Sequence, residues 1–182
     1  MRLVLDRLVA RQALARLSEL AAQESLTPPE LARIYVPAQH AKALNLDATV
    51  VVGMRGAGKS WWMAVLARPR HRAFVSGQLQ GSSLERVTAC VGFGLDDTER
   101  DFPGPETLDA LLGRGLDPAD IWQAVVLRHA LQAAELAFPF SMPPWEDAAQ
   151  WVIGHRGEAN DLLTQCDTKL AERDRVLLVL FD

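Results

Sequence analysis

The stretch GMRGAGKS, residues 53–60, constrains the fold more than any other part of the chain. It follows the β-branched run ATVVVG (48–53) and precedes an apolar segment that must end before Pro69. This order predicts a buried parallel strand, a glycine-rich turn and a helix. The backbone N–H groups of the turn and the positive end of the helix would then converge on one point, where phosphate oxygens can bind.

The residue types in this turn suit a nucleoside triphosphate. Lys59 would place its ammonium on the β and γ phosphates, and the Ser60 hydroxyl would ligate Mg²⁺. A structural glycine turn with an incidental lysine is the alternative interpretation. The residues expected to contact the nucleotide are Gly53, Arg55, Gly56, Ala57, Gly58, Lys59, Ser60, Trp61 and Tyr35. For Trp61 the pattern favours core packing over base stacking, and for Arg55 it favours solvent over phosphate.

The run VLLVLFD (176–182) predicts a second buried strand, which ends in a single carboxylate, Asp182. A parallel strand beside the strand of residues 48–53 would present its carboxyl end at the same sheet edge, where ligands of open α/β folds bind. We therefore expect Asp182 near Ser60. The alternative is a terminal carboxylate on an ordinary core strand.

The segment 53–60 resembles the Walker A motif of the P-loop NTPase superfamily, and 176–182 is similar to its Walker B motif. The resemblance implies ATP and Mg²⁺ as cofactors, Lys59 and Asp182 as catalytic residues, and Ser60 and Asp182 as metal ligands. The long segment before the loop and the box RIYVP (33–37) look most like AAA+, STAND and KAP-type ATPases. In that box Ile34, Tyr35 and Val36 could line the base, and core packing of Ile34 and Val36 is the alternative.

The resemblance implies an α/β fold, namely a three-layer P-loop NTPase-type parallel sheet flanked by helices and incomplete at its carboxyl end. We expect a helical linker over 1–47 and a partial NTPase core over 48–182. The interval 61–181 is longer than a compact core needs, which indicates a mainly helical insertion around 95–155.

Apolar periodicity and turn residues predict the remaining elements. The expected helices span 2–24, a short segment from Thr27, 38–44, 84–89, 106–112, 118–137 with Asp117 as cap, 146–153 and 158–172, and the expected further strands span 72–76 and 89–94.

The composition narrows the range of partners. A net charge of −4 does not indicate nucleic acid or anionic lipid, and no apolar run is long enough to cross a bilayer. The basic group of Arg68, Arg70, His71 and Arg72 is interpreted as a solvated loop rather than a phosphate contact. Two cysteines without ligand spacing suggest a reducing compartment and no structural metal, so we expect a cytoplasmic location. Self-association or a partner protein remains possible by analogy.

Three functions fit this pattern. The first is the amino-terminal portion of an Mg-dependent ATPase, slow or inactive by itself because no acid follows Asp182; the ending is interpreted as a truncation. The second is a nucleotide-gated switch or interaction module without turnover, and the third is a small-substrate phosphotransferase. Only residue type suggests other groups to activate water, namely His129, His155, Glu135 and Glu158.

Overall fold

The computed structural model describes residues 29–48, 50–54, 56–79, 81–94, 101–141 and 144–182. The fold is mixed and rich in helix, with a small parallel sheet of two strands, and is compatible with the α/β class. The described elements, in chain order, are η2 (Leu31–Arg33), η3 (Ala38–Lys42), α2 (Lys59–Leu66), α3 (Pro69–Gln78), η4 (Leu84–Arg86), β1 (Val87–Phe93), α4 (Pro105–Gly113), α5 (Pro118–Ala134), α6 (Trp145–Gly154), α7 (Arg156–Glu172) and β2 (Val176–Phe181).

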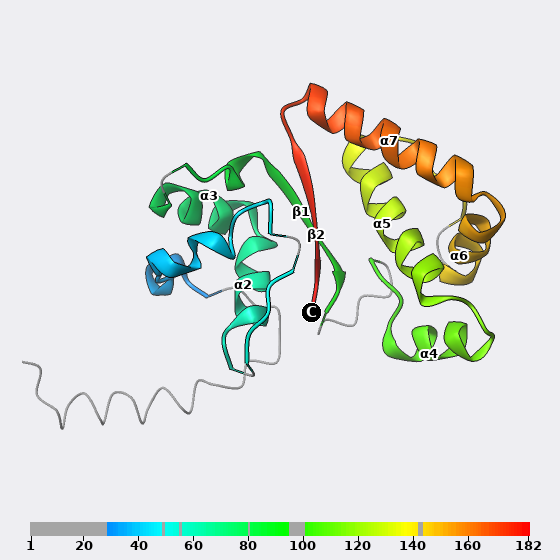
Figure 1. Ribbon diagram of the computed structural model, residues 1–182, viewed down its shortest axis with the longest axis horizontal. Helices are drawn as coiled ribbons and strands as arrows, with labels where there is room; N and C mark the ends of the chain where they lie inside the picture. Colours follow the sequence, from blue (N-terminus) through cyan, green and yellow to red (C-terminus); the bar gives the residue numbers. More distant parts are fainter. Residues whose placement is uncertain (1–28, 49, 55, 80, 95–100, 142–143) are drawn as a thin grey trace, which may run out of the picture.

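The sheet joins two segments that are far apart in the sequence. β1 pairs with β2 in parallel, beginning with Val87 opposite Val176, and a bulge interrupts the register between Val91 and Phe93. Helices α2 and α3 lie on one side of this sheet, and α5, α6 and α7 lie on the other (Figure 1). Helices on both faces explain why the strands are apolar runs rather than alternating ones.

Each face of the sheet has its own hydrophobic core. On the side of α5, buried residues of α4 to α7 pack with Leu177 of β2. On the side of α2, the buried cluster packs with Leu178 and Leu180. Successive side chains of a strand point to opposite faces, so β2 contributes to both cores. The buried cluster on the side of α2 consists of Ile34, Leu44, Val65, Leu66, Val75, Leu84 and Val87.

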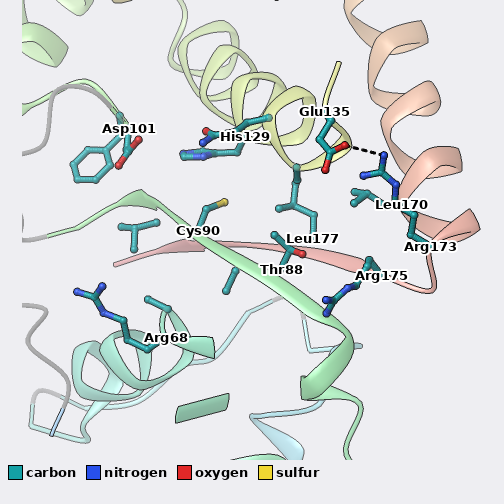
Figure 2. Close-up of a pocket in the computed structure, with 16 residues that line it drawn as sticks. Arg68, Thr88, Cys90, Asp101, His129, Glu135, Leu170, Arg173, Arg175 and Leu177 are labelled. Atoms are coloured by element: carbon teal, nitrogen blue, oxygen red, sulfur yellow. Dashed lines mark hydrogen bonds and ion pairs between the residues drawn. The ribbon is translucent and has the colours of Figure 1, made fainter. Parts of the chain in front are cut away.

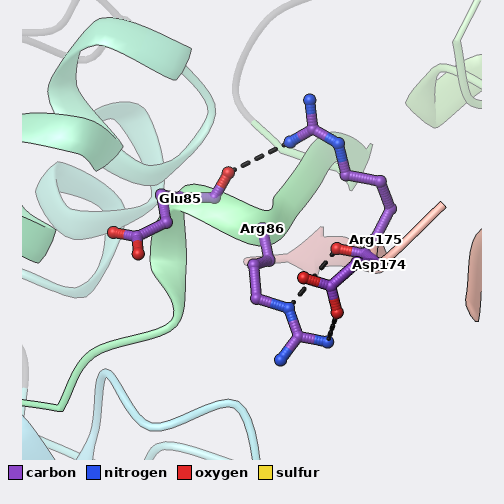
Figure 3. Close-up of polar contacts among 4 residues, drawn as sticks. All are labelled: Glu85, Arg86, Asp174 and Arg175. Carbon is purple, nitrogen blue, oxygen red and sulfur yellow. Dashed lines mark hydrogen bonds and ion pairs between the residues drawn. The ribbon is translucent and has the colours of Figure 1, made fainter.

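Four neighbouring residues tie together the starts of the two strands (Figure 3). Arg86 forms an ion pair with Asp174, 2.5 Å from Nη2 to Oδ1. Arg175 donates from Nη1 to the carbonyl oxygen of Glu85 at 3.0 Å. These contacts are exposed, so each contributes only about 0–1 kcal/mol, and their main effect is to fix the register.

Three predicted elements differ from the structure. Residues 50–53 form no strand, and Val50 and Val52 are 76% and 90% exposed. A β-branched run becomes a strand only where its backbone pairs with a neighbour, and β2 is paired with β1 instead. The predicted strand 72–76 lies inside α3, because Pro69 at the first helical position starts a helix there. The predicted helix 84–89 is a single 3-10 turn, after which β1 begins at Val87.

Most other elements are confirmed. The strand predicted over 89–94 is β1, and the helices predicted over 106–112, 118–137, 146–153 and 158–172 are α4 to α7. The Asp117 side chain caps α5 by accepting from the Ala119 N–H at 2.8 Å. The expected helical segment after Pro37 is the 3-10 helix η3. The helix over 2–24 and the start at Thr27 lie outside the described residues.

The side chains of Val179 and Phe181 of β2 pack directly against Gly92 of β1, and its replacement tests the sheet. A Cβ at Gly92 would lie 2.6 Å from both Phe181 Cζ and Val179 Cγ1. We expect Gly92→Ala to lower the free energy of unfolding by about 1–3 kcal/mol because the core would be overpacked. A Cβ at Gly77 in α3 meets nothing within 4 Å. Gly77→Ala should therefore leave stability equal or higher in urea denaturation, and equal loss in both variants would contradict the close approach.

Candidate functional site

The glycine-rich loop turns sharply into the first turn of α2. Gly56 and Gly58 have φ of +82° and +81°, in the left-handed region that residues with a Cβ rarely adopt. The Ala57 N–H donates to the Met54 carbonyl at 3.1 Å and closes the turn. Helix α2 begins directly afterwards at Lys59. The loop thus presents the amino end of a helix, whose first N–H groups lack intrahelical acceptors.

The Lys59 side chain folds back over its own loop. Its Nζ donates to the carbonyl oxygens of Gly53 at 2.8 Å and Met54 at 3.3 Å. Both bonds are exposed to solvent, so exchanging them for bonds to another acceptor costs little free energy. The ammonium is therefore positioned at the loop and can exchange these carbonyls for the oxygens of an anion.

Ser60 and Asp182 are in contact, as the sequence predicts. The Ser60 Oγ donates to Asp182 Oδ2 at 2.5 Å, although the two residues are 122 positions apart. The Asp182 N–H donates to the Phe93 carbonyl at 3.2 Å and continues the ladder of the sheet beyond β2. The sheet thus holds the carboxylate, and α2 holds the hydroxyl, at one point. Within the described ranges no group of three or more His, Cys, Asp or Glu side chains is placed to hold a metal ion.

A cavity of about 550 Å³ adjoins the loop. Residues 51–53, Met63 and Leu66 of α2 and the last residues of β2 all line it. β2 pairs only with β1 in the described part of the chain, so its second backbone edge faces this cavity. The described residues 50–53 therefore do not form the parallel strand that the sequence predicts beside β2.

The residues predicted to contact the base are not brought to this cavity. Tyr35 is 78% exposed and does not line it. Ile34 is buried in the core and Val36 packs against it, which is the alternative that the sequence left open. Trp61 packs against the same core and meets Trp62 edge-on, with 4.9 Å between ring centroids. Arg55 lies outside the described residues.

Sequence reasoning missed Trp62 and His40 at this cavity. The Trp62 Nε1 donates to His40 Nδ1 at 3.1 Å, and both side chains line the cavity. The sequence offered one signal, a histidine in the 3-10 segment after Pro37. The helical pattern of that segment did not indicate that it lies beside the loop.

None of the four residues suggested as water-activating groups lines the loop cavity. His155 stacks on Trp151, and Glu135 pairs with Arg173 at 3.1 Å. Glu158 lies in the first turn of α7, and His129 is buried on α5. Asp182 is the one acid among the described residues that line this cavity.

The basic group after α2 is not the solvated loop that the sequence favoured. Arg72 is buried in α3 and donates from Nη1 to the Leu66 carbonyl at 2.6 Å. Burial lowers the pKa of Arg72, and the positive charge of Arg175 lowers it further. Arg68 and Arg70 remain exposed, and a ring nitrogen of His71 lies 2.8 Å from the Pro29 carbonyl oxygen.

A second cavity, of about 820 Å³, lies along β1 and was not predicted (Figure 2). β1, α5, the end of α7 and the residues after α2 contribute to its lining. His129 and Cys90 face it. Burial, then the charge of Arg128, lowers the pKa of His129, so the imidazole is neutral at pH 7. No spacing of residues in the sequence could have revealed this cavity, because its lining comes from five separate segments, within 67–68, 88–91, 101–102, 129–135 and 170–177.

Comparisons with protein-family models, with curated protein sequences and with solved structures find no match. No helix among the described residues is long and apolar enough to cross a membrane. The assignment of function therefore depends on the geometry of the loop, the helix and the two strands.

The two free thiols should react slowly in the folded protein. Burial, with the nearby Asp101 carboxylate, raises the pKa of Cys90 from 9.0 to about 12. Burial also raises the pKa of Cys166. At pH 8 the thiolate fraction of Cys90 should be about a thousandfold below that of an ordinary cysteine. Alkylation by iodoacetamide, followed by peptide mass spectrometry, should be slow in buffer and fast in urea. Equally fast alkylation of Cys90 in buffer would contradict this environment.

Proposed function

We propose that the chain binds a nucleoside triphosphate, with ATP as the expected nucleotide, together with Mg²⁺ at the loop of residues 53–60. The observation that carries the proposal is the 2.5 Å contact between Ser60 Oγ and Asp182 Oδ2. An ordinary glycine turn does not require a hydroxyl at the start of its helix to meet a carboxylate at the end of a distant strand. The contact fits a pair of ligands that share one metal ion.

The loop itself would bind the phosphates. Its positive-φ glycines turn backbone N–H groups toward one point, and the amino end of α2 adds its partial positive charge. Lys59 would leave the carbonyls of Gly53 and Met54 and bind phosphate oxygens. This exchange replaces two bonds to neutral carbonyls by bonds in which both the donor and the acceptor are charged, which adds Coulomb attraction.

The residues present fit a magnesium ion. A hydroxyl oxygen and a carboxylate oxygen are hard ligands, and Mg²⁺ is commonly held by one or two protein ligands together with phosphates and water. Ser60 and Asp182 would supply these two protein ligands. When bound, the ion would neutralise charge on the transferred phosphoryl group.

We infer that the small observed sheet belongs to a larger parallel sheet of the P-loop NTPase type. The exposed Val51 and Val52 and the end of β2 line the same cavity, and β2 pairs only with β1 in the described part of the chain, so apolar side chains and backbone groups remain uncovered there. Further pairing in this cavity would cover both. This inference supports the assignment of residues 48–182 to the core and of the helices α4 to α6 to an insertion.

The reaction that fits this site is attack of water on the γ-phosphate, with Lys59 stabilising the developing negative charge. The described residues around the loop cavity provide no second acid to orient the water, so turnover by this chain should be slow. The same observation favours a second candidate, namely a module that binds nucleotide and responds to it without turnover.

Replacement of Lys59 tests nucleotide binding. Lys59→Ala should weaken binding of Mg·ATP by at least about tenfold, because a charge-assisted bond to phosphate is worth roughly 1.5–3 kcal/mol. Isothermal titration calorimetry would measure the dissociation constant. Lys169→Ala is the matched control, because Lys169 is exposed on α7 and lies outside the loop. Equal affinity of the Lys59→Ala variant and the parent chain would reject the proposal.

Replacement of the hydroxyl and the carboxylate tests the metal ion. Ser60→Ala and Asp182→Asn should each reduce the gain in ATP affinity that Mg²⁺ provides, while ATP binding in EDTA should change little. Since both side chains would bind one ion, the double variant should lose less than the sum of the two single losses. Additive losses, or unchanged dependence on Mg²⁺, would show that the 2.5 Å contact is only structural.

A further inference from the structure

The cavity along β1 is separate from the loop cavity. No residue lines both, and they lie beside opposite strands of the sheet, since one adjoins Thr88 to Val91 of β1 and the other adjoins the end of β2. Its volume of about 820 Å³ lies within the range of small-molecule sites, roughly 300–1,000 Å³. We propose that it is a second ligand site, which binds a small organic anion carrying hydroxyl groups.

An excess of positive charge surrounds this cavity. Three arginines and two acids line it, and both acids already have partners. Glu135 pairs with Arg173 at 3.1 Å, and Asp101 pairs at 3.3 Å with Arg128, which lies behind the lining. Two guanidinium groups, those of Arg68 and Arg175, are left without a carboxylate in the described part of the chain.

Neither Arg68 nor Arg175 would have to break an ion pair in order to bind an anion. Arg175 donates to the Glu85 carbonyl, which carries no net charge, and its four other N–H groups are unused by that bond. Arg68 is exposed, follows α2 directly, and its side chain has no hydrogen-bond or ion-pair partner among the described residues. A phosphate or carboxylate would therefore gain charge-assisted hydrogen bonds without breaking an existing ion pair.

His129 provides a polar group on the other side of the strand from Arg68. The side chain is 4% exposed, and its Nε2 is buried without a hydrogen-bond partner in the described structure, while hydrogen bonding between the imidazole and the backbone of Asp101 and Val91 opposes the fall in its pKa. Figure 2 shows His129 above β1 and Arg68 below it. Burial of an unpaired polar atom costs about 1–3 kcal/mol, so a ligand group that reaches it would recover that cost.

A hydroxyl is the ligand group that suits His129. A neutral imidazole has one donor and one acceptor nitrogen, and a hydroxyl can serve as partner to either. Apolar side chains of Phe102, Leu170 and Leu177 also line the cavity and would contact the carbon skeleton. The outer backbone edge of β1, which pairs with no other described strand, adds further donors and acceptors. These features together select a hydroxylated anion over a bare inorganic one.

Isothermal titration calorimetry on the full chain would test the site with four probes. Glucose 6-phosphate combines a phosphate with several hydroxyls, citrate combines three carboxylates with one hydroxyl, glucose has hydroxyls alone, and inorganic phosphate has no carbon skeleton. We expect saturable 1:1 binding of glucose 6-phosphate or citrate, and binding of glucose and inorganic phosphate at least tenfold weaker. Whichever hydroxylated anion binds more tightly identifies a phosphate or a carboxylate as the preferred group.

Three variants locate the binding. Arg68→Ala should lower the affinity for the bound probe by about tenfold or more, because one charge-assisted contact is lost. Arg70→Ala is the matched control, because Arg70 is an exposed arginine two positions away that does not line the cavity. Lys59→Ala should leave the probe's affinity unchanged, which separates this site from the loop even if the loop proves to bind no nucleotide.

Three results would overturn the proposal. They are absence of saturable binding by both hydroxylated anions, equal effects of Arg68→Ala and Arg70→Ala, and loss of binding in Lys59→Ala. His129→Gln adds a further test in a variant whose circular dichroism matches the parent, where weaker binding of glucose 6-phosphate or citrate supports the site and unchanged binding contradicts the role of His129.

Discussion

The parallel pairing of β1 with β2 is the interaction on which the rest of the structure depends. Parallel strands cannot be joined by a tight turn, and here the connection from residue 94 to residue 175 contains α4, α5, α6 and α7. These helices can cover one face of the sheet only because the pairing brings the end of the chain back beside β1. The side chains of β2 then enter both hydrophobic cores, so each core stabilises the pairing in return.

The pairing also determines what the glycine-rich loop can meet. The loop and the start of α2 are local structure, because they depend on the glycines and on the hydrogen bonds within the helix. The carboxylate is not local, because Asp182 reaches Ser60 only through β2 and through its own N–H bond to Phe93. The candidate metal ligands therefore depend on long-range strand pairing, and loss of the sheet would separate them even with the loop intact.

The sequence predicted the parts of this fold that depend on local chemistry. Asp117 before Pro118 identified the start of α5, and the apolar run before Asp182 identified β2. It failed at valines 50–52, where tertiary pairing decides the outcome, because they have high β-propensity but no paired neighbour in the described structure. It also failed at Arg72 to Ser76, which looked like a strand although the local signal of Pro69 starts a helix through them. Ser60 and Asp182 were predictable as a pair because a motif specifies both, whereas Arg68, His129 and Arg175 belong to no motif and are joined only by the folded chain.

The two proposed sites share structural elements, and this raises the question of whether they would act on one another. Helix α2 starts at the loop with Lys59 and leads at its end to Arg68, while β2 follows Arg175 and leads to Asp182. Shared elements alone do not transmit an effect, since coupling needs an element with two arrangements whose balance both ligands change. Both α2 and β2 are packed against buried cores. A ligand at one cavity would therefore affect the other only by changing how α2 or β2 packs against these cores.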